Sequence, residues 1–391
     1  MTQPLERVRR ELGTLGRAHT PTDVAEAMRS AGLVVTDQSL LEMLEALRRH
    51  STGAGALEDL LRQDGISDIV VNGASEVFID RGLGMESVQS GFDDDAQVRQ
   101  LAVRLAAATG RRIDDSQPFV DGRLADGTRL HAVLSPISSP GTCISLRIPA
   151  KRGFTLQEMA DQGSFSPRVE QLLRGIVTRK VPFLVTGGTG SGKTTLLSAL
   201  LSVAPRDERI IIAEDSRELL PDHPHCVRLE SRPPNAEGVG EITLTELVRQ
   251  SLRMRPDRLV LGEVRGAELS DLLLALNTGH EGGCSTVHAN SIFDAPTRLE
   301  ALGALGGLDR LACHAQVASA LKVVIHVARR TDGSRHISEI GLFRRKADGL
   351  VEVIPALADE GHSEEWQPGA EELLWLAGSD TGPSALGPRR A

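Results

Sequence analysis

The segment Gly187-Gly188-Thr189-Gly190-Ser191-Gly192-Lys193-Thr194 is an unbroken GxxxxGK[ST] pattern. Its glycines leave space for backbone N–H groups to converge on phosphate oxygens, an approach that side chains would block. An apolar run at 181–185 precedes it and a helical apolar pattern at 196–201 follows it, so a helix N-terminus adds partial positive charge beside the loop. The pattern predicts that Lys193 reaches the β- and γ-phosphates of a nucleotide and that the Thr194 hydroxyl holds Mg²⁺. We assign nucleotide binding to residues 187–195, Thr195 included.

Short apolar runs alternate with helical patterns on both sides of this loop. Two further runs, 209–213 and 258–261, are apolar or β-branched after their first residue, and further strands fit 284–288 and 323–327. Such runs are typical of strands that are covered on both faces, and their alternation with helices predicts an α/β fold with a parallel sheet. Near the end of the chain, residues 336–343 and 350–355 are predicted to pair as a hairpin.

Periodicity and composition divide the chain into four parts. Residues 1–50 have apolar positions at i, i+3 and i+4, which predicts a helical segment. Residues 51–150 combine a helical pattern with alternating strands and a turn signal at 125–127, which predicts an α+β domain with an antiparallel sheet. Residues 151–358 contain the GxxxxGK[ST] segment at 187–194, which we call the phosphate loop. The polar, Gly/Pro-rich tail at 359–391 is expected to be poorly ordered.

Composition argues against several classes of protein. The 391 residues carry a formal net charge of −9, with 3% aromatic residues and no tyrosine, so nucleic acid is not expected as a partner. No apolar run approaches the roughly 18–20 residues that span a bilayer, and no signal peptide is recognisable. We therefore expect a cytoplasmic protein, unless a partner holds it at a membrane. The four cysteines form no CxxC pair, and no zinc site is expected.

Acidic residues at predicted strand ends are the candidates for activating water and supporting magnesium. Glu263 follows the run at 258–261, and either Glu214 or Asp215 ends the run at 209–213 in the same way. The carboxyl ends of parallel strands gather at one ligand-binding edge, so these carboxylates are expected beside the phosphate loop.

Phosphoryl transfer also benefits from an arginine that neutralises developing negative charge. Arg123, Arg129 and Arg147 lie on predicted strands of the α+β domain, whereas Arg253 and Arg255 precede the Glu263 strand. The residues alone do not select among these candidates.

Together, these segments resemble the secretion ATPase family that powers type II secretion, type IV pili, tight-adherence pili and type IV conjugation channels. Residues 187–194 look like its Walker A loop, 212–215 like its Asp box, 253–266 like its Walker B segment and 278–290 like its His box. The resemblance covers about residues 57–345. Several pilus-branch relatives have Asp where Gly266 follows the Walker B arginine, and this departure favours the tight-adherence (CpaF-like) branch.

The resemblance implies a homohexameric ring whose RecA-like domains bind ATP beside their N-terminal domains. His280 and His288 flank a stretch with two glycines, and the residues alone do not assign a role to either histidine. In the ring that the resemblance implies, Glu263 polarises water, Glu214 supports magnesium and His288 senses the γ-phosphate. The residues that would reach nucleotide phosphates from the first domain, in the same subunit or across the ring, are Arg123, Arg129 and Arg147. The implied function is an ATP-hydrolysing motor for pilus assembly or protein secretion. It would push on an inner-membrane platform protein, which places the chain at the inner face of the cell membrane.

Two other functions fit part of the pattern. A DNA-transfer or helicase-like translocase would need a basic, aromatic-lined channel, which charge and composition disfavour. A nucleotide-gated scaffold would bind ATP with little turnover, and the combination of Lys193, Thr194 and Glu263 argues against it. DNA-stimulated ATP hydrolysis would support the first alternative, and nucleotide binding without phosphate release would support the second.

Overall fold

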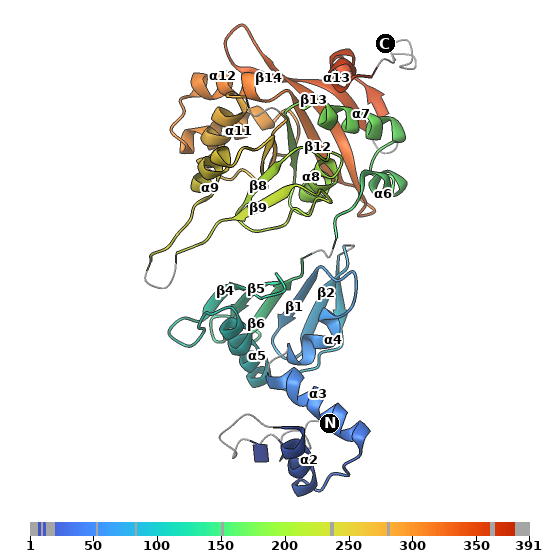
Figure 1. Ribbon diagram of the computed structural model, residues 1–391, viewed down its shortest axis with the longest axis vertical. Coiled ribbons are helices and arrows are strands. Elements are labelled where there is room, and N and C mark those ends of the chain that lie inside the picture. Colours follow the sequence, from blue (N-terminus) through green and yellow to red (C-terminus); the bar gives the residue numbers. More distant parts are fainter. Residues whose placement is uncertain are drawn as a thin grey trace. The chain divides into compact units, whose positions relative to one another are not determined.

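The computed structural model describes residues 7–8, 11–12, 20–51, 54–82, 84–149, 152–234, 238–279, 282–359 and 364–379. The chain forms two compact units, Met1–Ala150 and Lys151–Ala391, each of which has its own core (Figure 1). Among the described residues, no helix is both long and apolar enough to cross a membrane.

Two helices, α2 (Pro21–Ser30) and α3 (Asp37–Ser51), occupy most of the described residues 20–51. Thr20 caps α2 through a capping box with Asp23, and Pro21 takes the first helical position, where its missing N–H costs nothing. The two helices share a small apolar cluster that includes Met28 and Leu47.

A six-stranded antiparallel sheet forms the centre of the first unit, in the order β3-β2-β1-β6-β5-β4. Its strands are β1 (Asp68–Asn72), β2 (Glu76–Asp80), β3 (Met85–Val88), β4 (Phe119–Arg123), β5 (Arg129–Val133) and β6 (Cys143–Arg147). The short helices η1 (Gly55–Leu57) and α4 (Glu58–Leu61) precede the sheet, and α5 (Asp95–Ala108) packs on β4, β5 and β6. The predicted antiparallel sheet is confirmed, and β3 is a strand that the sequence did not indicate.

A nine-stranded sheet forms the centre of the second unit, in the order β15-β14-β13-β12-β7-β11-β10-β8-β9. Its strands are β7 (Phe183–Gly187), β8 (Ile210–Glu214), β9 (Cys226–Glu230), β10 (Arg258–Leu261), β11 (Cys284–Val287), β12 (Val323–Arg329), β13 (Arg335–Arg345), β14 (Val351–Asp359) and β15 (Glu364–Trp366). From β12 to β9 all neighbours are parallel, whereas β13, β14 and β15 pair antiparallel. The prediction of a parallel sheet holds for the strands from β12 to β9, but the sheet as a whole is mixed. The connection between Arg329 and Arg335 is too short for a crossover, so β13 turns back antiparallel to β12.

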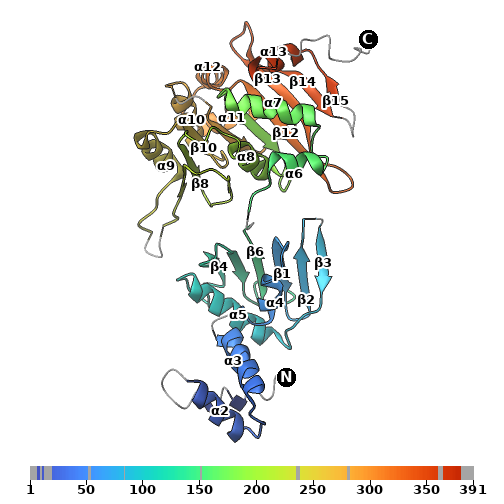
Figure 2. The ribbon, with the colours of Figure 1, turned by 45° about the vertical axis from the view of Figure 1, so that its right-hand side comes forward.

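Helices cover both faces of this sheet (Figure 2). One face carries α6 (Leu156–Asp161), α7 (Pro167–Thr178), α8 (Lys193–Leu201) and α13 (Ala370–Ala377). The other face carries α9 (Leu244–Ser251), which η2 (Leu252–Met254) extends, with α10 (Glu268–Leu276), α11 (Ala295–Leu305) and α12 (Arg310–Ala320). Successive residues of β7 enter opposite cores, Phe183 and Val185 on the first face and Leu184 on the second. This explains why the strand reads as a continuous apolar run.

The tail from residue 359 was expected to be poorly ordered, and for its described residues that prediction is wrong. Residues of β15 pair with β14, and Leu373 and Leu374 of α13 lie in the core beside α7. Glu364 accepts hydrogen bonds from the backbone N–H and the hydroxyl of Ser166, at 3.1 and 2.8 Å. The polar composition of this stretch concealed a short amphipathic helix that the α/β core buries.

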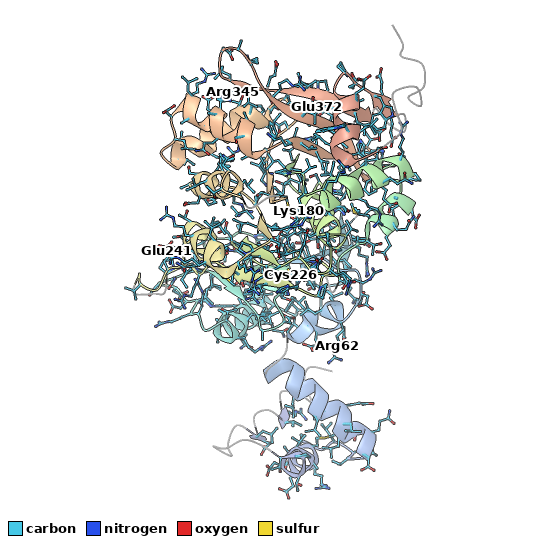
Figure 3. All side chains as sticks on the ribbon, turned by 45° about the horizontal axis from the view of Figure 1, so that its top comes forward. Arg62, Lys180, Cys226, Glu241, Arg345 and Glu372 are labelled. Carbon is cyan, nitrogen blue, oxygen red and sulfur yellow. The ribbon has the colours of Figure 1, made fainter. Side chains whose placement is uncertain are left out.

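A buried arginine anchors the amino end of β10. Arg258 is 1% exposed and forms an ion pair with Glu208. Glu208 also pairs at 3.2 Å with Lys180, which is labelled in Figure 3. The Arg258 guanidinium donates to the carbonyl oxygens of Val177 and Gly282 as well, at 2.6 and 3.4 Å. These bonds compensate the cost of burying the charge and tie β10 to α7 and to the residues that precede β11.

Candidate active site

The carboxyl ends of neighbouring parallel strands bring the predicted site residues of the second unit to one edge of the sheet. The order β8-β10-β11-β7 places Glu214 at the end of β8, Glu263 after β10, His288 after β11 and the phosphate loop after β7. Arg253 and Arg255 precede β10 and therefore lie at the other end of that strand. His280 falls outside the described residues.

Lys193 is the first residue of α8, and its ammonium is turned back into the loop. Its Nζ donates to the carbonyl oxygens of Gly187 and Gly188, at 3.0 and 2.9 Å, and lies 3.3 Å from Nδ1 of His288. Burial lowers the pKa of Lys193, and the nearby carboxylate of Glu263 opposes this change. The loop backbone and His288 thus hold a buried cation at the start of α8.

His288 links this lysine to the carboxylate of Glu263. Its Nε2 lies 2.8 Å from Oε1 of Glu263. Because a lysine ammonium only donates, Nδ1 of His288 accepts, so the ring proton is on Nε2 and is donated to Glu263. Burial lowers the pKa of His288, and the charge of Lys193 lowers it further, which favours a neutral ring at pH 7. Arg265 pairs with Oε2 of Glu263, so both carboxylate oxygens are held.

Of the two acids at the end of β8, Glu214 is the one that faces the protein interior. It is 2% exposed, and its Oε1 accepts the backbone N–H groups of Glu218 and Leu219, each at 3.0 Å. Burial raises the pKa of the Glu214 carboxyl against the lowering effect of these two hydrogen bonds. Asp215 is exposed and accepts from Ser231 at 3.2 Å. The two candidates therefore differ in burial and in hydrogen bonds, and the role of Glu214 toward magnesium is a proposal.

The oxygen atoms at this edge fit a magnesium ion that is held together with nucleotide phosphates. In the described part of the chain, the buried Oε2 of Glu214 and the buried Oγ of Ser191 have no hydrogen-bond partner. Thr194 and Thr195 lie half-buried in the first turn of α8. Mg²⁺ prefers carboxylate, hydroxyl, water and phosphate oxygens and usually keeps several waters, so these groups suit the ion or its water shell.

The predicted arginines of the first unit form a row across three strands. Arg123 of β4 is the register partner of Arg129 of β5, which is the partner of Arg147 of β6. Directly opposed residues point to the same face, so the three guanidinium groups are neighbours there, and Asp68 of β1, the register partner of Arg147, continues the row. The Nε of Arg123 donates to Gly127 at 3.2 Å, and Arg147 lies 4.0 Å from a carboxylate oxygen of Asp68. The row is a feature suited to anions, and its role toward a nucleotide is a proposal.

Two residues of the site were not singled out from the sequence. Arg265 forms an ion pair with Glu263. The sequence could have indicated this contact, because Arg265 follows Glu263 by two residues. Arg335 donates from Nε to the carbonyl oxygen of Gly190 at 3.1 Å. Its distance from the loop in sequence gave no sign of this contact.

Comparisons with known proteins find related sequences and structures. The model of the family described as "Type II/IV secretion system protein" matches residues 50–351. A Mycobacterium tuberculosis protein named "Putative conjugal transfer protein" is 51% identical over 336 residues, which cover 84% of this chain and 95% of that protein. The VirB11 ATPase of the Brucella suis type IV secretion system, solved in complex with sulphate, is 30% identical and matches 75% of this chain and 97% of its own, with a TM-score of 0.39. The Yersinia pseudotuberculosis ATPase DotB, 16% identical, shares the fold over 81% of both chains with a TM-score of 0.53.

Proposed function

We propose that this chain, which belongs to the family of type II/IV secretion system proteins, is an ATP-hydrolysing motor for pilus assembly or for export through an inner-membrane platform. The family is one of secretion ATPases. The observation that carries the proposal is the chain of contacts from Lys193 through His288 to Glu263 at the edge where the phosphate loop lies. Lys193, the cation for the terminal phosphate, contacts one ring nitrogen of His288, and Glu263, the carboxylate for water, contacts the other.

Each residue of this group has a separate task in ATP hydrolysis. The loop amides and the helix N-terminus bind the phosphates, and Lys193 exchanges its loop carbonyls for β- and γ-phosphate oxygens. Magnesium neutralises phosphate charge when it is bound, with Thr194 and Glu214 as the residues that would hold it or its waters. Glu263 orients the attacking water and accepts its proton. His288 loses its lysine partner when the γ-phosphate takes the ammonium, so its bond to Glu263 reports which phosphate is present.

The motor cycle also requires the first unit. We propose that Arg123, Arg129 and Arg147 bind nucleotide phosphates, because three neighbouring guanidinium groups on one face of a sheet suit a multiply charged anion. We further propose that the chain works as a homohexamer and that force passes to a platform protein at the inner face of the cell membrane. Sedimentation of the purified chain with and without ATP tests the hexamer.

The test of hydrolysis is phosphate release by the full chain and two variants. Lys193→Ala should lose ATP binding, because it removes the buried cation. Glu263→Gln should keep ATP binding and lower ATP turnover by about 10²–10⁴-fold, the usual contribution of a general base.

The matched controls are Lys346→Ala and Glu352→Gln, which change exposed residues of the β13–β14 hairpin. Both controls should hydrolyse ATP at the rate of the wild type. Near-normal phosphate release by both site variants would refute the assignment. Nucleotide binding without phosphate release by the wild type would instead identify a scaffold.

A second candidate function, a motor of conjugal transfer, is favoured by the name of the mycobacterial relative. Against it stand the net charge of −9 and the low aromatic content. ATP hydrolysis that single- or double-stranded DNA stimulates, with a steep salt dependence, would select this function. ATP hydrolysis that DNA does not stimulate would instead support protein export or pilus assembly. Within the latter, we propose the tight-adherence branch because Gly266 stands after Arg265.

A further inference from the structure

The hairpin between β12 and β13 stands directly beside the phosphate loop. β12 runs parallel to β7, with Val327 in register with Gly187, the last residue of β7. At this point the chain of β7 turns into the loop, whereas β12 continues to Arg329 and returns as β13 from Arg335. The first residue of β13 is thereby brought to the loop.

The turn of this hairpin and the start of β13 are fixed by buried contacts. The side chains of Arg330 and Asp359 are 10% and 8% exposed and form an ion pair at 2.8 Å. Arg330 also donates to the carbonyl oxygen of Gly163 at 3.2 Å, and the N–H of Ile337 donates to Ser164 at 3.0 Å. A side chain that leaves this hairpin therefore starts from a rigid element rather than from a mobile loop.

Arg335 contacts the phosphate loop at two points. Its Nε donates to the carbonyl oxygen of Gly190 at 3.1 Å. A Cβ added to Gly192 would come within 3.0 Å of Cδ of Arg335. Gly192 also has a φ of +100°, which residues with a side chain rarely adopt. The arginine stem thus lies against the last glycine before the lysine.

The bond to Gly190 determines the direction of one phosphate-binding amide. In a trans peptide the C=O and the following N–H point in opposite directions. When Arg335 holds the oxygen of Gly190, the N–H of Ser191 therefore points away from the guanidinium. The structure agrees, because this N–H is directed across the loop toward the carbonyl oxygen of Gly188, at 3.4 Å.

We propose that Arg335 is a positioning residue of the phosphate loop: it holds the Gly190–Ser191 peptide with its N–H turned away from the guanidinium, so that the Ser191 amide can exchange its long bond to Gly188 for a nucleotide phosphate oxygen. The inference rests on the proposed nucleotide binding and adds a residue to it. Without Arg335 this peptide can rotate and present a carbonyl oxygen, which repels phosphate. A bound nucleotide restores the orientation at the expense of affinity, while Glu263 and His288 are untouched.

The experiment measures ATP affinity, KM and kcat of the full chain with Arg335→Ala. Dissociation constant and KM should each rise about tenfold or more, the effect of losing a hydrogen bond from a charged donor, with kcat within about twofold of the wild type. Arg329→Ala, at the register partner of Arg335, removes the same charge from the same hairpin and should behave like the wild type. Arg335→Gln, which keeps an N–H donor without charge, should recover part of the affinity.

Inorganic tripolyphosphate, used as a competitive inhibitor, separates loop positioning from contact with the base or ribose. Its inhibition constant should rise by the same factor as the dissociation constant of ATP in Arg335→Ala. The proposal is overturned if Arg335→Ala matches Arg329→Ala, if kcat falls while KM stays, or if tripolyphosphate inhibition is unchanged. Failure of the wild type itself to bind ATP would refute the proposed function instead.

Discussion

A methyl group added at Gly262 would strike the buried Glu214, and this substitution tests the site at its most tightly packed point. A Cβ on Gly262 would lie 2.6 Å from Cγ of Glu214, against an ordinary contact of 3.4–4 Å. The backbone of Gly262 cannot retreat, because its N–H donates to Ala213 at 2.9 Å and its carbonyl oxygen accepts from Thr286 at 2.8 Å. Glu214 is held in turn by the two amides that it accepts. Either the contact stays compressed or the carboxylate rotates away from both amides.

Overpacking of this kind costs about 1–3 kcal/mol. For Gly262→Ala we take about 2 kcal/mol, which for a unit of this size lowers the melting temperature by about 4–8 °C. ATP turnover in magnesium should fall as well, because the proposed support for the metal is displaced. Thermal unfolding and phosphate release of the full chain measure the two effects.

Two variants make this result specific to Glu214. Gly266→Ala is the matched control, since its Cβ would meet only the end of the Glu268 side chain, at 3.3 Å. In a Glu214→Ala background the clashing Cγ is absent, so Gly262→Ala should then cost less than about 0.5 kcal/mol. The reasoning would be refuted if the losses in unfolding free energy of the two single variants added up in the double variant. It would also be refuted if the Gly262→Ala protein had the melting temperature and the ATP turnover of the wild type.

Two further predictions concern charge. The pKa of the Glu214 carboxyl is raised in the folded state, so the folded protein binds this proton at a higher pH than the unfolded chain. The wild type should therefore gain stability relative to Glu214→Gln as the pH falls from 7 through the raised pKa toward 4.5, and a pH-independent difference in urea unfolding would contradict this. Arg129 lies between Arg123 and Arg147, so Arg129→Ala should lower ATP turnover and leave the free energy of unfolding within about 0.5 kcal/mol of the wild type. Unfolding and phosphate release measured on one preparation check this, and equal losses in both would indicate a structural role only.

Local pattern was sufficient to locate the strand, loop and helix around Lys193 and most strands of both sheets. A glycine-rich loop between an apolar run and a helix depends on neighbours within a few residues, and so does strand alternation. The apolar run at 258–261 coincides with β10, and Glu214 and Glu263 were found because they end such runs. The segment at 364–379 was missed because its polar composition outweighed a short amphipathic helix that only the core completes.

The sequence by itself determined most of the candidates for the proposed chemistry, because residue type and spacing are local properties. Only the tertiary structure decided their contacts. β11 lies between β7 and β10, so His288 reaches Lys193 with one nitrogen and Glu263 with the other. The β12–β13 hairpin likewise carries Arg335 to Gly190. Strand order and hairpin placement are set by the burial of two apolar faces across the whole sheet, a non-local balance that no single stretch of the chain contains.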